Sequence, residues 1–493
     1  MQISASKLIG HLRRHPVAIL AVGAFTYLSG HLALARGFLP YDEQYHYGLV
    51  QYYAHHANPF MGHEPAGMGA YGVVAHQGSY LYHYLMSLPL RLIQPFVHSQ
   101  YAQLLVLRSL NILLGIATLY LLYRLARRLG LGAVAAQVVV LAFALTPVFY
   151  QLSAQLNYDN LLIPITILCI VMALKITEQI RTGGDWAFQT AGLVSLLLVA
   201  SLVKYSFLPI MAAIVLYLAV LLFRSYGWRG IAKALANGFR GVSRWQKVAI
   251  VTLLVASGLL WGQRYGVNLV QYHTPNPQCN AVMSVQTCSA YGTWSRNYQL
   301  HATRDERPMS GLQLTYFTHI WAKMMAAEPY SIVQVSPDGH PTYVKQQPLL
   351  SVAMVIVGAG CLALLLSFRR LMRLPALPLL ASVTAAYLLV LWGQNFADYH
   401  NLHFLVAVQG RYLLPVLPIL YAGLALAYVY AFDTVLNFQR TRLRAALGGL
   451  VVVCWLGLQS LRRIGHLVLE SITRTGARAQ VFAHDLVVRD PSI

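Results

Sequence analysis

The sequence predicts an all-α polytopic membrane protein, and three observations support this fold class. Of its 493 residues, 57% are hydrophobic and only 10% are charged, whereas soluble domains average about a quarter charged residues. Apolar runs of about 20 residues, long enough to cross a bilayer as a helix, recur along the chain. No stretch has the short alternating strands of a membrane β-barrel. Because backbone groups in lipid must be paired internally, helices are the natural spanning form.

We predict about eleven transmembrane helices from the spacing of these apolar runs. They are 17–35, 104–123, 133–150, 160–177, 187–203, 206–223, 248–266, 349–367, 376–393, 411–431 and 445–461. The first follows basic residues as a signal peptide does, but it is long and no small-residue cleavage site follows, so we expect it to be retained. The chain then divides into a transmembrane domain, 1–461, and a short polar tail, 462–493.

Lysine and arginine are concentrated in alternate loops. The basic loops are 124–132, 178–186, 224–247, 368–375 and 432–444. The short loops 150–159 and 394–410 contain neither residue, so the positive-inside rule predicts a cytoplasmic N-terminus. The net charge of +21 then reflects topology and contact with anionic membrane lipids. No nucleic-acid-binding module is recognisable, and we expect no nucleic-acid partner.

Two long segments, 36–103 and 267–348, are predicted to lie outside the membrane. Both are rich in Tyr, His, Gly and Pro, and amphipathic patches in the first predict interfacial helices. The second contains Cys279 and Cys288. An oxidising exterior permits a disulfide between them; the alternative is two free thiols.

Carboxylates occur at three places on the predicted outer side. Asp42 and Glu43 follow the first span, Asp159 begins the fourth, and Asp398 precedes the tenth. The chain has only 15 acidic residues, and charges at the edge of the hydrocarbon are costly and usually functional. The alternative is that each is a helix cap, a position that Asp favours.

Two basic residues lie at the same level. Lys204 separates the fifth and sixth spans, and Arg411 begins the tenth. Arginine suits bidentate phosphate contact and lysine acts as a point charge; the alternative is snorkelling to lipid headgroups. A carboxylate acts as a general base, and cations stabilise a departing phosphate. The set predicts transfer of a group from a lipid-phosphate donor to an acceptor outside the cell.

Three motifs give this set a family resemblance. They are Pro40-Tyr41-Asp42-Glu43-Gln44-Tyr45-His46, Asn157-Tyr158-Asp159 and Gln409-Gly410-Arg411-Tyr412. With them the chain resembles GT-C glycosyltransferases that use polyprenyl-phosphate sugars, the superfamily of protein O-mannosyltransferases and lipid A aminoarabinose transferases, and within it a bacterial branch. The resemblance implies a GT-C-like bundle in the bacterial plasma membrane with its active site on the extracytoplasmic face.

The resemblance also implies roles for the motif residues. Asp42 would deprotonate the acceptor hydroxyl in a single inverting displacement, and Glu43 would position donor or acceptor. Asp159 would bind a sugar hydroxyl or a divalent metal. Arg411 and Lys204 would hold the donor phosphate. The remaining substrate-binding candidates are Tyr45, His46, Asn157 and Gln409. The acceptor would be an envelope glycan, lipid or protein, and the choice stays open because the large soluble outer domain of bigger relatives is lacking.

A divalent metal is a candidate cofactor. Imidazole and carboxylate together suit zinc or manganese, so His46 with Asp42 or Asp159 forms a candidate site, although no pair has structural-zinc spacing. The alternative is that the histidines contact the interface or a sugar. Most tyrosines fit an interfacial aromatic belt, with Tyr45 as a candidate for the pocket.

Two other functions stay open. A transporter or flippase of lipid-linked glycans would place charges near the bilayer midplane and often shows an internal repeat, and neither feature is recognisable. A polysaccharide polymerase or ligase would be a transferase that uses lipid-diphosphate donors. No Gly-rich nucleotide loop is present, which disfavours a nucleotide-sugar donor.

Overall fold

The computed structural model describes residues 15–56, 58–60, 63–65, 68–303, 311–335, 341–344 and 347–436. These residues form helices and one antiparallel pair of strands. The elements are α2 (Pro16–Ala33), α3 (Glu43–His55), η1 (Met68–Tyr71), α4 (Leu81–Ile93), α5 (Gln100–Arg128), α6 (Ala133–Ala144), α7 (Pro147–Ser153), α8 (Asp159–Thr182), α9 (Ala187–Val203), η2 (Tyr205–Phe207), α10 (Leu208–Gly238), α11 (Arg244–Trp261), η3 (Gly262–Gly266), α12 (Val267–Tyr272), α13 (Cys279–Val282), α14 (Val285–Cys288), α15 (Gly292–Thr303), α16 (Gly311–Ala327), η4 (Glu328–Tyr330), β1 (Ile332–Val335), β2 (Pro341–Val344), α17 (Gln347–Leu371), α18 (Leu377–Leu402), η5 (Gly410–Leu413) and α19 (Leu417–Leu436).

Seven described helices are long and apolar enough to cross a membrane, or eight if one bent pair counts as a single span. The seven are Pro16–Ala33, Gln100–Arg128, Asp159–Thr182, Tyr205–Gly238, Arg244–Tyr272, Met354–Leu371 and Leu377–Leu402. The prediction of a helical polytopic membrane protein is therefore confirmed, whereas the count of about eleven spans is not. The predicted span 445–461 and the tail 462–493 lie outside the described residues.

The predicted third and tenth spans differ from the observed helices. The third is broken between α6 and α7, which meet at a bend of 67°. Pro147 begins α7, and a proline is compatible with the first turn of a helix but not with its interior. The tenth begins later than predicted, because residues 410–413 form the separate turn η5 before α19.

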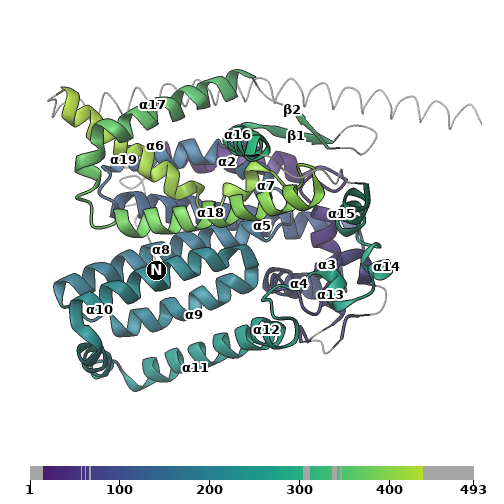
Figure 1. Ribbon diagram of the computed structural model, residues 1–493, viewed down its shortest axis with the longest axis horizontal. Coiled ribbons are helices and arrows are strands. Elements are labelled where there is room, and N and C mark those ends of the chain that lie inside the picture. Colours follow the sequence, from purple (N-terminus) through teal and green to yellow (C-terminus); the bar gives the residue numbers. More distant parts are fainter. Residues whose placement is uncertain are drawn as a thin grey trace, which may run out of the picture.

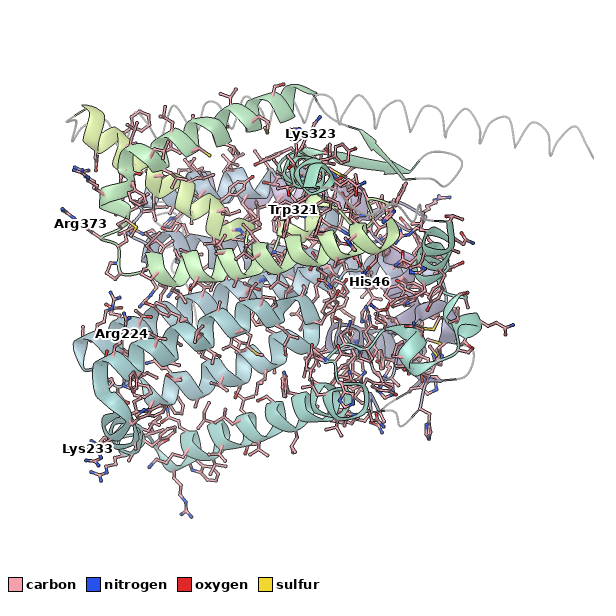
Figure 2. All side chains as sticks on the ribbon, in the orientation of Figure 1. His46, Arg224, Lys233, Trp321, Lys323 and Arg373 are labelled. Carbon is pink, nitrogen blue, oxygen red and sulfur yellow. A yellow bond between two sulfur atoms is a disulfide. The ribbon has the colours of Figure 1, made fainter. Side chains whose placement is uncertain are left out.

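The long helices lie alongside one another, and the short helices α3, α4, α13, α14 and α15 gather at one end of them (Figure 1). Figure 2 places His46 toward that end, whereas Arg224, Lys233 and Arg373 lie at the opposite end. One end of the bundle therefore carries the motif histidine, and the other carries residues of the predicted basic loops.

Helix α5 packs closely against α2 and α7 at Gly115. A Cβ at this position would lie 2.3 Å from Cζ of Phe25 and 2.9 Å from Oγ of Ser153. Phe25 is fully buried and stacks on Phe149 of α7 at 5.0 Å between ring centroids. Glycine is required here because three helices approach within a distance that leaves no room for a side chain.

Replacing Gly115 by Ala should destabilise the protein by about 1–3 kcal/mol, because the added methyl group overpacks this junction. The measurement is the thermal unfolding midpoint in detergent. Gly258→Ala in α11 is the matched control, since nothing lies within 4 Å of its Cβ position. Similar midpoints for the two variants would contradict the packing argument.

Candidate active site

Asp42 lies on a turn with an unusual backbone. Tyr41 and Asp42 have φ angles of 69° and 68°, in the left-handed region that non-glycine residues adopt at a cost of about 1–2 kcal/mol each. Asp42 precedes α3, but its side chain makes no capping hydrogen bond. The structure thus does not place this carboxylate as a helix cap, and the turn directs it elsewhere.

The Asp42 carboxylate pairs with Arg411. Nη2 of Arg411 donates to Oδ2 of Asp42 at 2.8 Å, and the side chains are 9% and 60% exposed respectively. The guanidinium carbon of Arg411 lies 5.0 Å from the ring centroid of Tyr41 and 5.3 Å from that of Tyr412. In this site Asp42 is therefore an accessible carboxylate held by a buried cation.

Two buried polar atoms beside this pair lack a partner among the described residues. They are Nε of Arg411 and Oε1 of Gln409, the residue two positions earlier. Buried donors and acceptors are normally satisfied. The neighbourhood of Arg411 thus retains hydrogen-bonding capacity that a bound ligand can use.

Lys204 forms a second buried pair with Asp159. Nζ of Lys204 donates to both carboxylate oxygens, at 2.8 and 2.9 Å, and both side chains are almost fully buried. Burial lowers the pKa of Lys204 while Asp159 opposes that shift. Asp159 does not act as the cap of α8: Tyr158 occupies that position, and Asn157 Oδ1 accepts the backbone N–H of Asp159 at 3.0 Å.

Tyr412 joins the two pairs. Its ring centroid lies 5.4 Å from Nζ of Lys204 and 5.3 Å from the guanidinium carbon of Arg411. Tyr158 contacts the same ammonium at 4.4 Å. Aromatic faces stabilise cations where water is excluded. The structure thus brings the motif residues Asp42, Asp159 and Arg411 together with Lys204.

Glu43 lies beneath the site, fully buried with Arg108 of α5. Nε of Arg108 donates to Oε1 at 2.9 Å and Nη2 to Oε2 at 2.6 Å. The backbone N–H groups of Leu39 and Leu156 donate to the same carboxylate at 2.7 and 3.1 Å. Because both oxygens are already occupied, the expected contact of Glu43 with donor or acceptor would require this carboxylate to leave Arg108.

Arg108 uses its remaining donors on the chain that leads to Asp42. Nη1 and Nη2 donate to the carbonyl oxygens of Ala33, Ala35 and Gly37 at 2.9, 2.6 and 2.7 Å. The Glu43–Arg108 pair therefore makes hydrogen bonds with four segments: the end of α2, the turn before α3, helix α5 and the link between α7 and α8.

His46 packs against the site through neutral contacts. Its Nδ1 lies 2.8 Å from Nε2 of His83, and its Nε2 lies 3.2 Å from Nδ2 of Asn157. The Asn157 amide donates, so Nε2 of His46 accepts and Nδ1 donates to His83. Burial lowers the pKa of His83 to about 3. Burial, His83 and the charges of Arg411 and Lys204 hold the pKa of His46 well below its usual range.

The proposed metal ligands are not assembled as a metal site. Within the described residues, no group of three or more His, Cys, Asp and Glu side chains is placed to hold an ion. His46 directs its ring nitrogens at His83 and Asn157, Asp159 binds Lys204, and Asp42 binds Arg411. A metal would have to displace one of these contacts.

Part of the second segment predicted to lie outside the membrane packs on the first. The ring of Tyr45 stacks on Tyr291 at 5.5 Å, and its hydroxyl lies 3.4 Å from Oε1 of Gln77. Tyr291 follows the loop in which a disulfide joins Cys279 to Cys288. Tyr45 thus belongs to an aromatic wall of the site. Asp398, predicted in a loop, lies within α18 instead, because that helix continues to Leu402.

Several residues of the site were given no role by the sequence analysis. Arg108 and His83 contact motif residues. Tyr158 and Tyr412 belong to the motifs themselves, and their rings contact Lys204 and Arg411. A signal existed for Arg108, since it is an arginine inside an otherwise apolar predicted span, and intramembrane charges usually have a specific partner. The sequence carried no comparable signal for His83.

Comparison with known proteins gives one family match. Residues 84–238 match the family described as dolichyl-phosphate-mannose-protein mannosyltransferase. The match includes Arg108, Asp159 and Lys204 but neither Asp42 nor Arg411. For the part of the chain that it covers, it confirms the predicted relation to GT-C glycosyltransferases and supports a membrane glycosyltransferase. No curated protein matches the chain.

Two kinds of solved structure are similar to the chain at low identity. The oligosaccharyltransferase AglB from Archaeoglobus fulgidus, solved with an inhibitory peptide and a dolichol-phosphate, has a TM-score of 0.47 and 14% identity over 91% of this chain and 55% of its own. A second structure of the enzyme from that organism holds Zn and sulfate. ArnT from Cupriavidus metallidurans has a TM-score of 0.35 and 14% identity over 85% of this chain and 77% of its own. The chain spans about half the length of the archaeal enzyme.

Removing one member of the Glu43–Arg108 pair should be strongly destabilising, by about 3–5 kcal/mol, because it leaves a buried charge unpaired. Glu43→Gln and Arg108→Met should each lower the thermal unfolding midpoint, and the double variant should lose less than the sum. Arg128→Met is the control. It breaks a solvent-exposed pair with Glu178, which we expect to contribute at most about 1 kcal/mol. Additive losses in the double variant would contradict the coupling.

Stability should fall in acid because His46 and His83 are buried in their neutral forms. The unfolded chain takes up protons below about 6.5 and the folded chain only near 3 for His83, so their contribution is complete above pH 6.5 and decreases as the pH falls. The slope is about 1.4 kcal/mol per pH unit for each ring. Thermal midpoints between pH 7.5 and 4.5 measure it. His83→Gln should flatten the profile, and an unchanged profile would refute this assignment.

Proposed function

We propose that the protein is a glycosyltransferase that moves a sugar from a polyprenyl-phosphate donor to an extracytoplasmic acceptor with inversion. One observation carries the proposal. Asp42, an exposed carboxylate, pairs with Arg411, and the ring of Tyr412 contacts both Arg411 and Lys204. A candidate base and two cations from distant parts of the sequence thus share one site, as transfer from a lipid phosphate requires.

In the proposed reaction, Asp42 accepts the proton of the acceptor hydroxyl. The acceptor oxygen forms a bond to the anomeric carbon as the bond from that carbon to the phosphate oxygen breaks, and polyprenyl phosphate leaves. Arg411 stabilises the negative charge that develops on the phosphate. Lys204, almost fully buried and paired with Asp159, acts through its positive charge at short range.

The other motif residues take supporting roles in this scheme. Glu43 and Arg108 fix the turn that carries Asp42, because their hydrogen bonds converge on it. Asn157 and His46 form a neutral wall below the site. Gln409 has a carboxamide oxygen that is unpartnered among the described residues and is the candidate for a sugar hydroxyl. A divalent metal stays a candidate cofactor, with Asp42 as its exposed ligand.

Arg411 has two tasks in this proposal. It holds Asp42 in the free protein, and it binds the phosphate of the donor. Because the two anions compete for one guanidinium, arrival of the donor loosens Asp42 and frees Oδ2 to accept the proton. Nε of Arg411, buried without a partner among the described residues, supplies a further donor to the phosphate.

The arrangement of charges supports an extracytoplasmic site. Arg224, Lys233 and Arg373 lie at the end of the bundle opposite His46 (Figure 2), and cytoplasmic loops carry the excess of basic residues. We therefore assign the site to the outer face of a bacterial plasma membrane, beside lipid-linked donors. An envelope glycan, lipid or protein is the acceptor.

Asp42→Asn separates the two roles of the carboxylate. Sugar release from polyprenyl-phosphate sugars by the purified protein should fall by about 10²-fold or more, because the general base is lost. Binding of polyprenyl phosphate without sugar should instead tighten severalfold, because Arg411 has lost its competitor. Glu178→Gln is the control, because this exposed carboxylate pairs with Arg128, and it should leave both values near those of the wild type.

Four results would count against the proposal. Equal turnover by Asp42→Asn would remove the base assignment. Weaker phosphate binding by that variant would refute the competition for Arg411. Lipid scrambling without sugar transfer would favour a transporter of lipid-linked glycans, and transfer from lipid diphosphates alone would favour a polymerase or ligase.

A further inference from the structure

Arg411 lies on a very short turn whose position is set by contacts with neighbouring elements. The turn η5 contains only Gly410, Arg411, Tyr412 and Leu413. On one side, the hydroxyl of Tyr387 in α18 donates to the carbonyl oxygen of Tyr412 at 2.6 Å. Four residues form too little structure to hold a buried guanidinium by themselves, so neighbouring elements must position it.

Glu328 supplies a contact on the other side. Its Oε2 accepts the backbone N–H of Gly410, the residue before Arg411, at 2.5 Å. Charge-assisted hydrogen bonds of this kind are shorter and stronger than neutral ones. Glu328 begins η4, which belongs to the second long outer segment.

The backbones of η4 and η5 also meet closely. A Cβ on Gly410 would lie 2.5 Å from Cδ of Pro329 and 2.7 Å from Cβ of Glu328. Glycine at this motif position is therefore explained by its contact with η4. Leu413, at the end of η5, packs in a small core with Phe317 and Met325 of α16.

The turn η4 is itself held by contacts with α7, α19 and the bend between α6 and α7. The hydroxyl of Tyr330 lies 3.2 Å from that of Tyr421 in α19, which lies 2.7 Å from Oγ1 of Thr146. Nε2 of Gln151 in α7 donates to the carbonyl oxygen of Ser331 at 3.4 Å. The position of Glu328 is thus fixed by the hydrogen bonds that hold η4 against neighbouring elements.

We propose that Glu328 is a positioning residue that sets Arg411 for the donor phosphate, so that the second outer segment completes the phosphate site. This inference rests on the proposed function. Glu328 acts through the backbone of Gly410 and does not touch the substrate. Its hydrogen bond places η5 so that the guanidinium reaches Asp42 and the incoming phosphate alike.

The test compares Glu328→Ala with Glu328→Gln. The Gln amide oxygen still accepts the Gly410 N–H, whereas Ala cannot. Glu328→Ala should weaken binding of polyprenyl phosphate about 10-fold and raise the KM for the lipid donor more than it lowers kcat, since small displacements of positioning groups have effects of this size or larger. Glu328→Gln should retain most of the affinity. Glu178→Ala is the control, because this carboxylate pairs with Arg128, about 30 Å along α5 from Arg108.

Amide hydrogen exchange gives a readout that needs no ligand. Exchange in the peptide covering residues 405–414 should become faster in Glu328→Ala and stay slow in Glu328→Gln. Wild-type affinity and exchange in Glu328→Ala, or equal losses in both variants, would overturn the inference. If the wild type failed to bind polyprenyl phosphate, the proposed function would fail, and the exchange comparison would still decide whether Glu328 holds η5.

Discussion

The buried ion pair between Glu43 and Arg108 is the interaction on which the rest of the site depends. A bidentate pair out of contact with water is stable only if its remaining hydrogen-bonding groups are satisfied. Here two backbone N–H groups bind Glu43, and three carbonyl oxygens bind Arg108. These partners come from segments adjacent to Asp42, so satisfying the pair also fixes the turn that presents Asp42 to solvent.

The three carboxylates of the site differ in how far their side chains are exposed. Glu43 is fully buried, Asp159 nearly so, and Asp42 is largely exposed. Each carboxylate has its own cation, which keeps the buried groups charged without a net local charge. Among the three pairs that the described residues form in this site, only Asp42–Arg411 combines an accessible carboxylate with a cation whose Nε lacks a partner, and this difference is the reason for proposing Asp42 as the base.

The sequence was sufficient to predict the fold class and the convergence of the site. Apolar runs located most of the long helices, and their alternation placed Asp42, Asp159 and Arg411 on one side. The ion pairs between these charged side chains were not predictable from the sequence. Glu43 and Arg108, for example, are separated by 65 positions, and hydropathy indicates only how deep a residue lies in the membrane, not which residue it contacts. The bend before Pro147 and the turn η5 were also missed, since an apolar run does not show where a helix is interrupted.

The separation of Asp42 from Arg411 has a consequence for biogenesis. The two residues are 369 positions apart, and the segment that holds Arg411 is packed between α18 and η4. A nascent chain released from the ribosome only as far as α17 has a candidate base but lacks the cation that pairs with it. In the proposed reaction, competence therefore arises late in synthesis, after most of the long helices have been made, and incomplete chains would lack the cation proposed to bind the donor phosphate.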